Sequence, residues 1–232
     1  MSCQSVAIPA YFYPSPESSP WIAAFAAQPG IGIMVANVDS GPGTTADANY
    51  ATAIAQARAA GVTVFGYVYT DYAENSLASV EANISLWNSL YGVTDIFLDQ
   101  TSTSAATESY YQTLTSYVHA ETPGSLTILN FGAVPPQSFM NAGDIVVTFE
   151  GDYSTYTSTT FPSWVESYAA DRFYHIVYDV PDQSAMTQVL SHAEHYNVGY
   201  VYATDDTLPN PYDSVPPYLS SEAIAARSNC SL

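Results

Sequence analysis

Residues 62–100 read VTVFGYVYTDYAENSLASVEANISLWNSLYGVTDIFLDQ. Two segments rich in β-branched and aromatic residues, 62–71 and 95–100, have the composition of β-strands. Between them, segment 76–90 opens on Ser76, a residue type that caps helix N-termini. The apolar residues of this middle segment fall on one helical face: Leu77, Val80, Ile84 and Trp87. The stretch therefore predicts a βαβ unit, and its nearly continuous apolar strands are typical of a parallel sheet that is buried on both faces.

The same alternation extends along the whole chain. Strand-like segments cover 6–13, 31–39, 62–71, 95–100, 125–132, 144–150, 173–180 and 198–205, and helix-like segments cover 47–60, 76–90, 104–121 and 184–196. Eight strands separated by helices predict an α/β fold, a small (β/α)8 barrel of the TIM type that forms one domain over residues 1–232. A doubly wound open sheet is the alternative, but no G-x-G-x-x-G opens a helix after the first strand.

The charge balance excludes several classes of protein. The 232 residues include 22 Asp and Glu but only 3 Lys and Arg, a net charge of -19. Nucleic-acid binding needs clustered cations, so we expect no nucleic-acid partner. The three cations are Arg58, Arg172 and Arg227, so Lys is absent and neither a Schiff-base nor a P-loop mechanism is available. His192 and His195 lack a third metal ligand, and we expect neither a metal ion nor another cofactor.

The chain has features of a secreted protein. Hydrophobic residues make up 47% of it, enough for a core, but no apolar run approaches the roughly 18 residues of a membrane span. Asn83 and Asn229 begin glycosylation sequons. Cys3 and Cys230 lie at opposite ends of the chain. Closure of the barrel would bring them together in a disulfide; the alternative is that both are reduced. We expect an extracellular monomer, free or associated with the cell wall, that does not bind membranes.

Candidate site residues stand at the C-terminal ends of the predicted strands, where barrel enzymes carry their chemistry. Asp99 and Glu150 end the apolar runs IFLD and VVTFE. Burial of an unpaired carboxylate in such a run costs free energy, so its presence there indicates a function. Other strand ends provide predicted substrate contacts: Tyr13, Asp39, Tyr69, Asn130, Tyr178 and Tyr202. Aromatic faces, amides and carboxylates suit hydroxyl-rich ligands, and a carboxyl pair can hydrolyse a glycosidic bond. For an Asp such as Asp39, the structural alternative is a cap on the next helix.

Four motifs carry a resemblance to a known family: AIPAYFYPSP at 7–16 followed by Trp21, GVTDIFLDQ at 92–100, LNFG at 129–132 and TFEGDY at 148–153. Over nearly its whole length the chain resembles the spherulation-specific family 4, or spherulin-4-like, proteins. The resemblance implies a barrel similar to the endo-acting glycoside hydrolases of family 135. Those enzymes cleave α-1,4-linked N-acetylgalactosamine in galactosaminogalactan, a fungal exopolysaccharide of biofilms, so the resemblance implies a polysaccharide substrate.

The resemblance also implies site residues, with one departure. In that family an Asp-Glu pair ends strand four and a Glu ends strand six, positions that fall on Asp99, Gln100 and Glu150. An amide cannot donate a proton. Gln100 therefore has three possible explanations. The chain is an enzyme in which Asp99 and Glu150 suffice, or it is a catalytically silent polysaccharide-binding or spore-wall protein, or the Gln is an engineered substitution. In the enzyme, one carboxyl acts as acid/base and the other attacks, or orients the substrate's acetamido group. The acidity either attracts a partly deacetylated, cationic polymer or serves only solubility in an acidic or saline medium.

Overall fold

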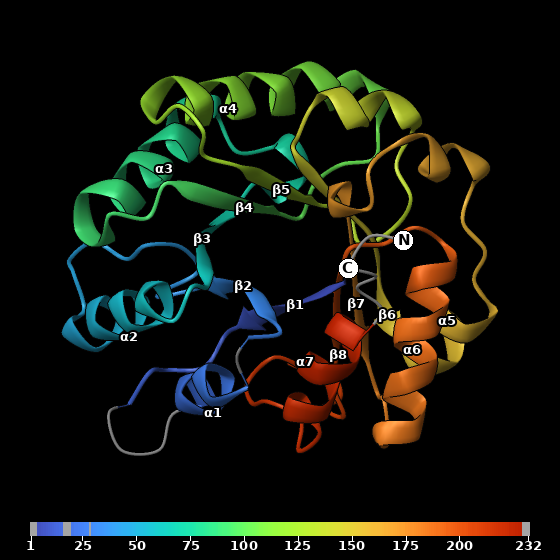
Figure 1. The fold of residues 1–232 in the computed structure, drawn as a ribbon. Coiled ribbons are helices and arrows are strands. Elements are labelled where there is room, and N and C mark those ends of the chain that lie inside the picture. The colour runs from blue at the N-terminus through green and yellow to red at the C-terminus, as the bar shows by residue number, and fades with distance from the viewer. Residues whose placement is uncertain (1–3, 16–19, 28, 229–232) are drawn as a thin grey trace.

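Eight parallel strands close into a barrel in the computed structural model, which describes residues 4–15, 20–27 and 29–228 (Figure 1). Each strand pairs with the next one in the sequence, and β8 pairs with β1. The strands are β1 (Ser5–Ala10), β2 (Ile31–Ala36), β3 (Thr63–Tyr69), β4 (Asp95–Asp99), β5 (Thr127–Asn130), β6 (Ile145–Asp152), β7 (Phe173–Tyr178) and β8 (Tyr200–Ala203). The predicted (β/α)8 fold class is confirmed, and closure between β1 and β8 excludes the open sheet.

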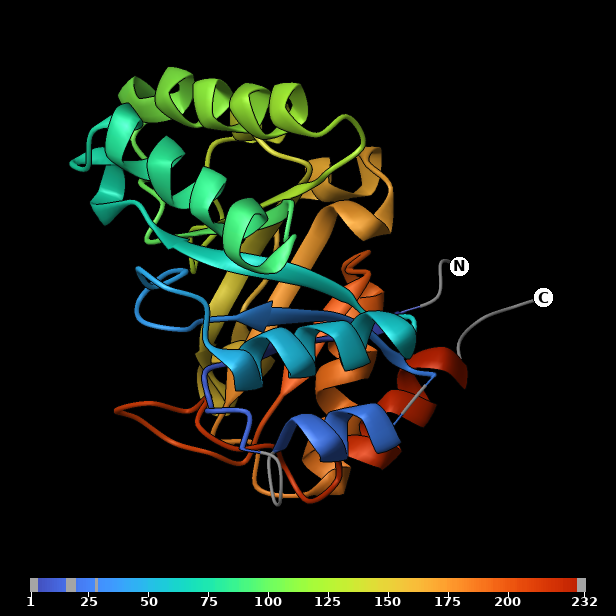
Figure 2. The ribbon, with the colours of Figure 1, turned by 90° about the vertical axis from the view of Figure 1, so that its left-hand side faces the viewer.

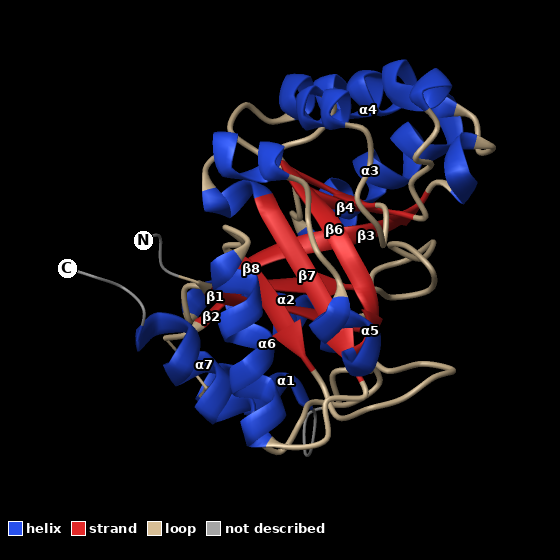
Figure 3. Cartoon of the chain, turned by 90° about the vertical axis from the view of Figure 1, so that its right-hand side faces the viewer, coloured by secondary structure: helices blue, strands red, loops and turns tan. Residues whose placement is uncertain are grey.

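Helices cover the outside of the strands (Figures 2 and 3). They are α1 (Pro20–Ala26), α2 (Ala48–Ala59), α3 (Leu77–Tyr91), α4 (Glu108–Glu121), α5 (Tyr153–Ser158), α6 (Gln183–His195) and α7 (Leu219–Ser228). Between β5 and β6 the outer layer has only a 3-10 turn, Gln137–Asn141. No helix within the described ranges is both long and apolar enough to cross a membrane.

The βαβ unit quoted at the start shows how helix and sheet pack together. Gly66 has no side chain, and a Cβ built there would lie 2.5 Å from the ring of Trp87. The indole of Trp87 therefore lies directly on β3 and donates from Nε1 to the Tyr67 carbonyl at 2.7 Å. Val80 and Ile84, on the same face of α3, are also buried as predicted. This contact fixes the helix against the strand whose C-terminal end reaches the site.

The barrel seam between β8 and β1 is short, and a long connection follows β8. The two strands pair only through Ser5 with Tyr200 and Val6 with Val201. Residues 204–218 then run to α7, and the Tyr11 N–H donates to a carbonyl of this connection, that of Tyr212, at 3.2 Å. The connection thereby reaches the C-terminal end of the barrel, which we call the mouth. Cys3 and Cys230 lie outside the described residues.

Candidate active site

Asp99, Asn130 and Glu150 meet at the mouth, from the ends of β4 and β5 and from β6. The Asn130 Nδ2 donates to Asp99 Oδ1 and to Glu150 Oε2, at 2.7 Å in each case. Because the Gly132 N–H donates to Asn130 Oδ1 at 3.0 Å, the amide is fixed with its NH2 toward the acids. The two bridged carboxylate oxygens therefore lie at most twice 2.7 Å apart. The structure thus brings together three residues that the sequence predicted.

Each carboxylate also receives a hydrogen bond from a tyrosine. Tyr67 donates to Asp99 Oδ2 at 2.8 Å, and Tyr212 donates to Glu150 Oε1 at 2.6 Å. The ring of Tyr11 stands between these tyrosines and meets both edge to face, with centroids 5.5 and 5.6 Å away. Burial, followed by the charge of the neighbouring acid, raises the pKa of both Tyr67 and Tyr212. Their hydroxyls therefore stay protonated and act as donors.

The surroundings affect Asp99 and Glu150 unequally. Burial raises the pKa of Asp99, against hydrogen bonds from Tyr67, the Gln100 N–H and Asn130. Burial also raises the pKa of Glu150, and the negative charge of Asp99 raises it further, against hydrogen bonds from Tyr212 and Asn130 only. Asp99 has three donors to stabilise its anion and Glu150 has two. Of the pair, Glu150 is therefore the one that holds a proton more readily.

Gln100 contributes its backbone to this arrangement. It has a left-handed conformation with φ of 50°, and its carbonyl accepts from the Tyr72 N–H at 2.8 Å and from Thr70 Oγ1 at 2.9 Å. Thr70 Oγ1 also donates to the Asp99 carbonyl at 2.8 Å. The hydrogen bonds that join the two carboxylates do not pass through the Gln100 side chain.

The remaining predicted contacts occupy different positions. Tyr69 ends β3 and donates to Asp71 at 2.8 Å. Tyr178 ends β7 opposite Asp152 of β6, and burial and the charges of Asp152, Asp179 and Glu150 raise its pKa. Tyr13 and Asp39 lie farther out: Tyr13 is 52% exposed and donates to Asp47 at 3.1 Å, and Asp39 is exposed between β2 and α2.

Tyr202 is buried near the end of β8. The side chain is fully buried, and its hydroxyl donates to the Ser214 carbonyl at 3.4 Å. Ser214 belongs to the 204–218 connection, which covers the end of β8. The structure thus shows the Tyr202 hydroxyl engaged by the chain itself, and its contact with substrate stays a prediction.

Three tyrosines near the carboxylates, Tyr11, Tyr67 and Tyr212, are not among the site residues that the sequence predicts. Tyr11 was one of several strand-end tyrosines with nothing to distinguish it. Tyr67 shares a strand face with Tyr69, two residues away, so strict alternation was a usable signal. Tyr212 lies in a connection without periodicity, nine residues beyond the end of β8, and no sequence pattern places it near Glu150.

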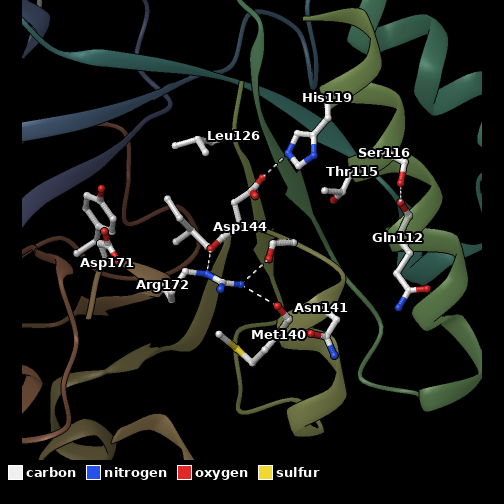
Figure 4. A pocket seen from close by; sticks show the side chains of 13 residues that line it. Gln112, Thr115, Ser116, His119, Leu126, Met140, Asn141, Asp144, Asp171 and Arg172 are labelled. Atoms are coloured by element: carbon white, nitrogen blue, oxygen red, sulfur yellow. Dashed lines mark hydrogen bonds and ion pairs between the residues drawn. The ribbon is translucent and has the colours of Figure 1, made fainter. Parts of the chain in front are cut away.

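A pocket of about 650 Å³ lies at the opposite end of the barrel, among the N-terminal ends of β5 to β8 (Figure 4). Three of its charged groups, His119, Asp144 and Arg172, hold parts of the chain together. His119 Nε2 lies 3.0 Å from Asp144 Oδ2, and Arg172 donates to the carbonyls of Met140, Gly143 and Asp144. This end of a barrel ordinarily serves stability. Within the described part of the chain, no three His, Cys, Asp or Glu side chains are grouped so that they could hold a metal ion.

Comparisons with known proteins agree with this fold. A model of spherulation-specific family 4 matches residues 5–226. Spherulin-4 of Physarum polycephalum is 30% identical over 234 residues, which are 95% of this chain and 69% of that protein. The crystal structure of Aspergillus clavatus Sph3 in complex with GalNAc has the same fold, with a TM-score of 0.83 and 22% identity over 97% of this chain and 98% of that one.

More distant structures share the barrel alone. A GH5-4 broad-specificity endoglucanase from Clostridium acetobutylicum has a TM-score of 0.55 and 8% identity over 98% of this chain and 97% of its own. The family match covers nearly the whole described chain, including all eight strands and the three residues Asp99, Asn130 and Glu150. The chain belongs to spherulation-specific family 4.

Proposed function

We propose that this protein is a retaining endo-acting glycoside hydrolase that cleaves α-1,4-linked N-acetylgalactosamine or galactosamine polymers. One observation carries the proposal: Asp99 and Glu150 share the NH2 group of Asn130 at the mouth of the barrel. Retaining glycosidases hold their two carboxyl groups about 5 Å apart, whereas inverting enzymes need roughly 6.5–9.5 Å to admit a water molecule. The limit of twice 2.7 Å between the bridged oxygens supports the retaining geometry.

Glu150 takes the role of acid/base and Asp99 that of nucleophile. Glu150 is suited to carry the proton because it is buried and its anion receives two hydrogen bonds, whereas that of Asp99 receives three. In the first step the Glu150 carboxyl protonates the glycosidic oxygen as its bond to C1 breaks, and an Asp99 oxygen bonds to C1. In the second step Glu150 removes a proton from water, which attacks C1 and releases Asp99.

Asn130 and the two tyrosines keep the carboxyls in place while charge moves between them. As Asp99 bonds to C1 it loses its negative charge, and as Glu150 gives up its proton it gains one. Asn130 Nδ2 donates to both groups, so it stabilises whichever is ionised without moving. Tyr67 and Tyr212 do the same for one carboxyl each.

The substrate assignment rests on relatives. The Sph3 structure contains GalNAc, and this chain carries a net charge of -19 that would attract a partly deacetylated, cationic polymer. We place the activity outside the cell, in a monomer, because the acidic composition and the sequons suit a secreted protein.

A second function, binding without cleavage, is favoured by one observation. Gln100 stands beside Asp99 where the resembling enzymes have Glu. In a silent member of the family the same mouth would hold the polymer and release it intact. The retained pair of Asp99 and Glu150 argues for the enzyme, since a binding protein has no need of two carboxyls that share one amide.

Release of reducing ends from purified galactosaminogalactan, with mass spectrometry of the products, tests the proposal. The chain is compared with its Asp99→Asn, Glu150→Gln and Gln100→Glu variants. We expect cleavage by the parent chain and its loss in either carboxyl variant. Cleavage by Gln100→Glu alone would show a silent member, and binding without cleavage by any variant would establish the binding protein. Neither binding nor cleavage would refute the substrate assignment.

A further inference from the structure

Strand β6 carries one extra residue, two positions before Glu150. In the pairing with β7, Val147 is opposite Tyr174 and Phe149 is opposite His175, so Thr148 has no partner in the register. An extra residue of this kind is a β-bulge, which re-aims the side chains that follow it. Without it, strict alternation would give Glu150 the same face as Thr148.

The side chains show the effect of the bulge. Thr148 and Phe149 are consecutive, yet both contact His175: Thr148 Oγ1 lies 2.9 Å from its Nε2, and the Phe149 ring lies 6.2 Å from its ring. Phe149 also packs on Tyr156 of α5, with centroids 4.8 Å apart. The next residue, Glu150, bonds to Asn130 at the mouth. The bulge thus gives two successive residues to the outer face and turns the carboxyl to the inner one.

His175 is held in a fully buried position with a partner on each ring nitrogen. Its Nε2 pairs with Thr148 Oγ1, and its Nδ1 lies 2.8 Å from the Tyr156 hydroxyl. Phe161 stacks on the imidazole at 4.4 Å. Burial lowers the pKa of His175 to about 3, so the ring is neutral and one nitrogen donates while the other accepts.

We propose that His175, through its hydrogen bond to Thr148, is a positioning residue that fixes the β6 bulge and so aims Glu150 at the substrate. The proposed role rests on the function proposed above. The chain from imidazole to carboxyl is short: His175 fixes Thr148, and Glu150 follows two residues later in the same strand. Loss of the Thr148 hydroxyl leaves a buried ring nitrogen without its partner, which favours a different register for the strand.

Thr148→Val tests this role, because it keeps the shape of the side chain and removes the hydroxyl. Thr148→Ser is the rescue, and Thr115→Val is the matched control. Thr115 is also buried, and its hydroxyl donates to the Ala142 carbonyl at 2.7 Å, but it belongs to α4. We expect Thr148→Val to lower kcat by about 10- to 100-fold with KM within about 2-fold, since a misplacement of about 1 Å costs that much. Thr148→Ser and Thr115→Val should stay near the parent kcat.

A second readout separates this inference from the proposed function. Carbon-13 NMR of the Glu150 carboxyl, assigned with Glu150→Gln, reports its environment whether or not the chain cleaves polymer. A shifted titration in Thr148→Val but not in Thr115→Val supports the positioning role even if activity is absent. Equal losses of kcat in Thr148→Val and Thr115→Val, with an unchanged Glu150 titration, would overturn it.

Discussion

Tyr212→Phe removes one hydroxyl from the site and leaves the ring in place. The lost group donates to Glu150 Oε1 at 2.6 Å. The edge-to-face contact of its ring with Tyr11 needs no hydroxyl and should persist. After the change, Asn130 is the only side chain among the described residues known to donate to Glu150. The substitution therefore isolates one hydrogen bond to a carboxylate.

The magnitude follows from the strength of such a bond. A hydrogen bond to a charged group contributes about 1.5–3 kcal/mol, and one pKa unit corresponds to about 1.36 kcal/mol. Water can replace part of the loss because Glu150 keeps some exposed surface. We therefore expect the lower end, a shift of about one pH unit. Its sign is upward, because the donor stabilises the ionised form and its removal favours the protonated one.

The pH dependence of kcat/KM is the assay. If Glu150 is the acid, its deprotonation sets the basic limb of the profile, and Tyr212→Phe should move that limb up by about one unit. Tyr67→Phe is the matched variant, because Tyr67 donates to Asp99 at 2.8 Å. Ionisation of Asp99 sets the acidic limb, so Tyr67→Phe should raise that limb instead. Because the two carboxyls are coupled, it is the contrast between the two substitutions that assigns the limbs to Glu150 and Asp99.

The opposite response of the two limbs would refute the roles of Glu150 as acid and Asp99 as nucleophile. If Tyr212→Phe moves the acidic limb and Tyr67→Phe the basic one, Glu150 is the nucleophile and Asp99 the acid. If neither substitution moves either limb while both proteins remain folded by circular dichroism, the phenol hydrogen bonds do not set the protonation of the pair.

Three further predictions concern the bridge, the fold and the rim. Asn130→Asp keeps the shape but puts a third carboxyl where both acids need a donor, so kcat should fall by about 10²-fold or more, with the melting temperature as control. Glu222 is fully buried, and burial raises its pKa. Its contribution to stability is therefore complete at acid pH and is lost as the pH rises. Glu222→Gln should reduce the fall in melting temperature of the protein between pH 5 and pH 8. Tyr72 is 56% exposed beside Gln100, and Tyr72→Ala should raise KM by roughly 3- to 10-fold at constant kcat, through a lost stacking contact with a sugar.

The barrel was predictable because its signals are local and repeated. Residues 62–100 already contain two strands, a capped helix and the apolar face that packs on Gly66, and similar patterns recur along the chain. Asp99, Asn130 and Glu150 were identified from strand ends because the ends of parallel strands must gather at one edge. The barrel topology brings these three strand ends together independently of the conformation of the loops.

Side-chain direction and long connections were not predictable. The prediction of Glu150 rests on its carboxyl chemistry, whereas strict alternation along β6 assigns its side chain to the outer face. The bulge at Thr148 turns the side chain to the inner face. Tyr202 ends a strand like the others, but residues 204–218 fold over it. The same connection carries Tyr212 to Glu150. Both outcomes depend on how a 15-residue segment without periodicity packs.

The distribution of positive charge helps to explain why the pKa values of Asp99 and Glu150 are both raised. All three arginines of the chain donate to carbonyls at the N-terminal end of the barrel: Arg58 to Gly92 before β4, Arg172 to Gly143 before β6, and Arg227 to Pro29 before β2. The sequence has no lysine, so the mouth has no Lys or Arg side chain to pair with Asp99 or Glu150.

A guanidinium beside Glu150 would lower its pKa and leave it ionised, unable to protonate a leaving group. Neutral phenols and an amide orient the carboxyls just as well, and they stabilise the anion less than a cation does. The lack of cations at the mouth and the phenol donors Tyr67 and Tyr212 are thus two aspects of one arrangement. It holds two acids close together and raises the pKa of both, a condition that favours acid/base cleavage of a glycosidic bond.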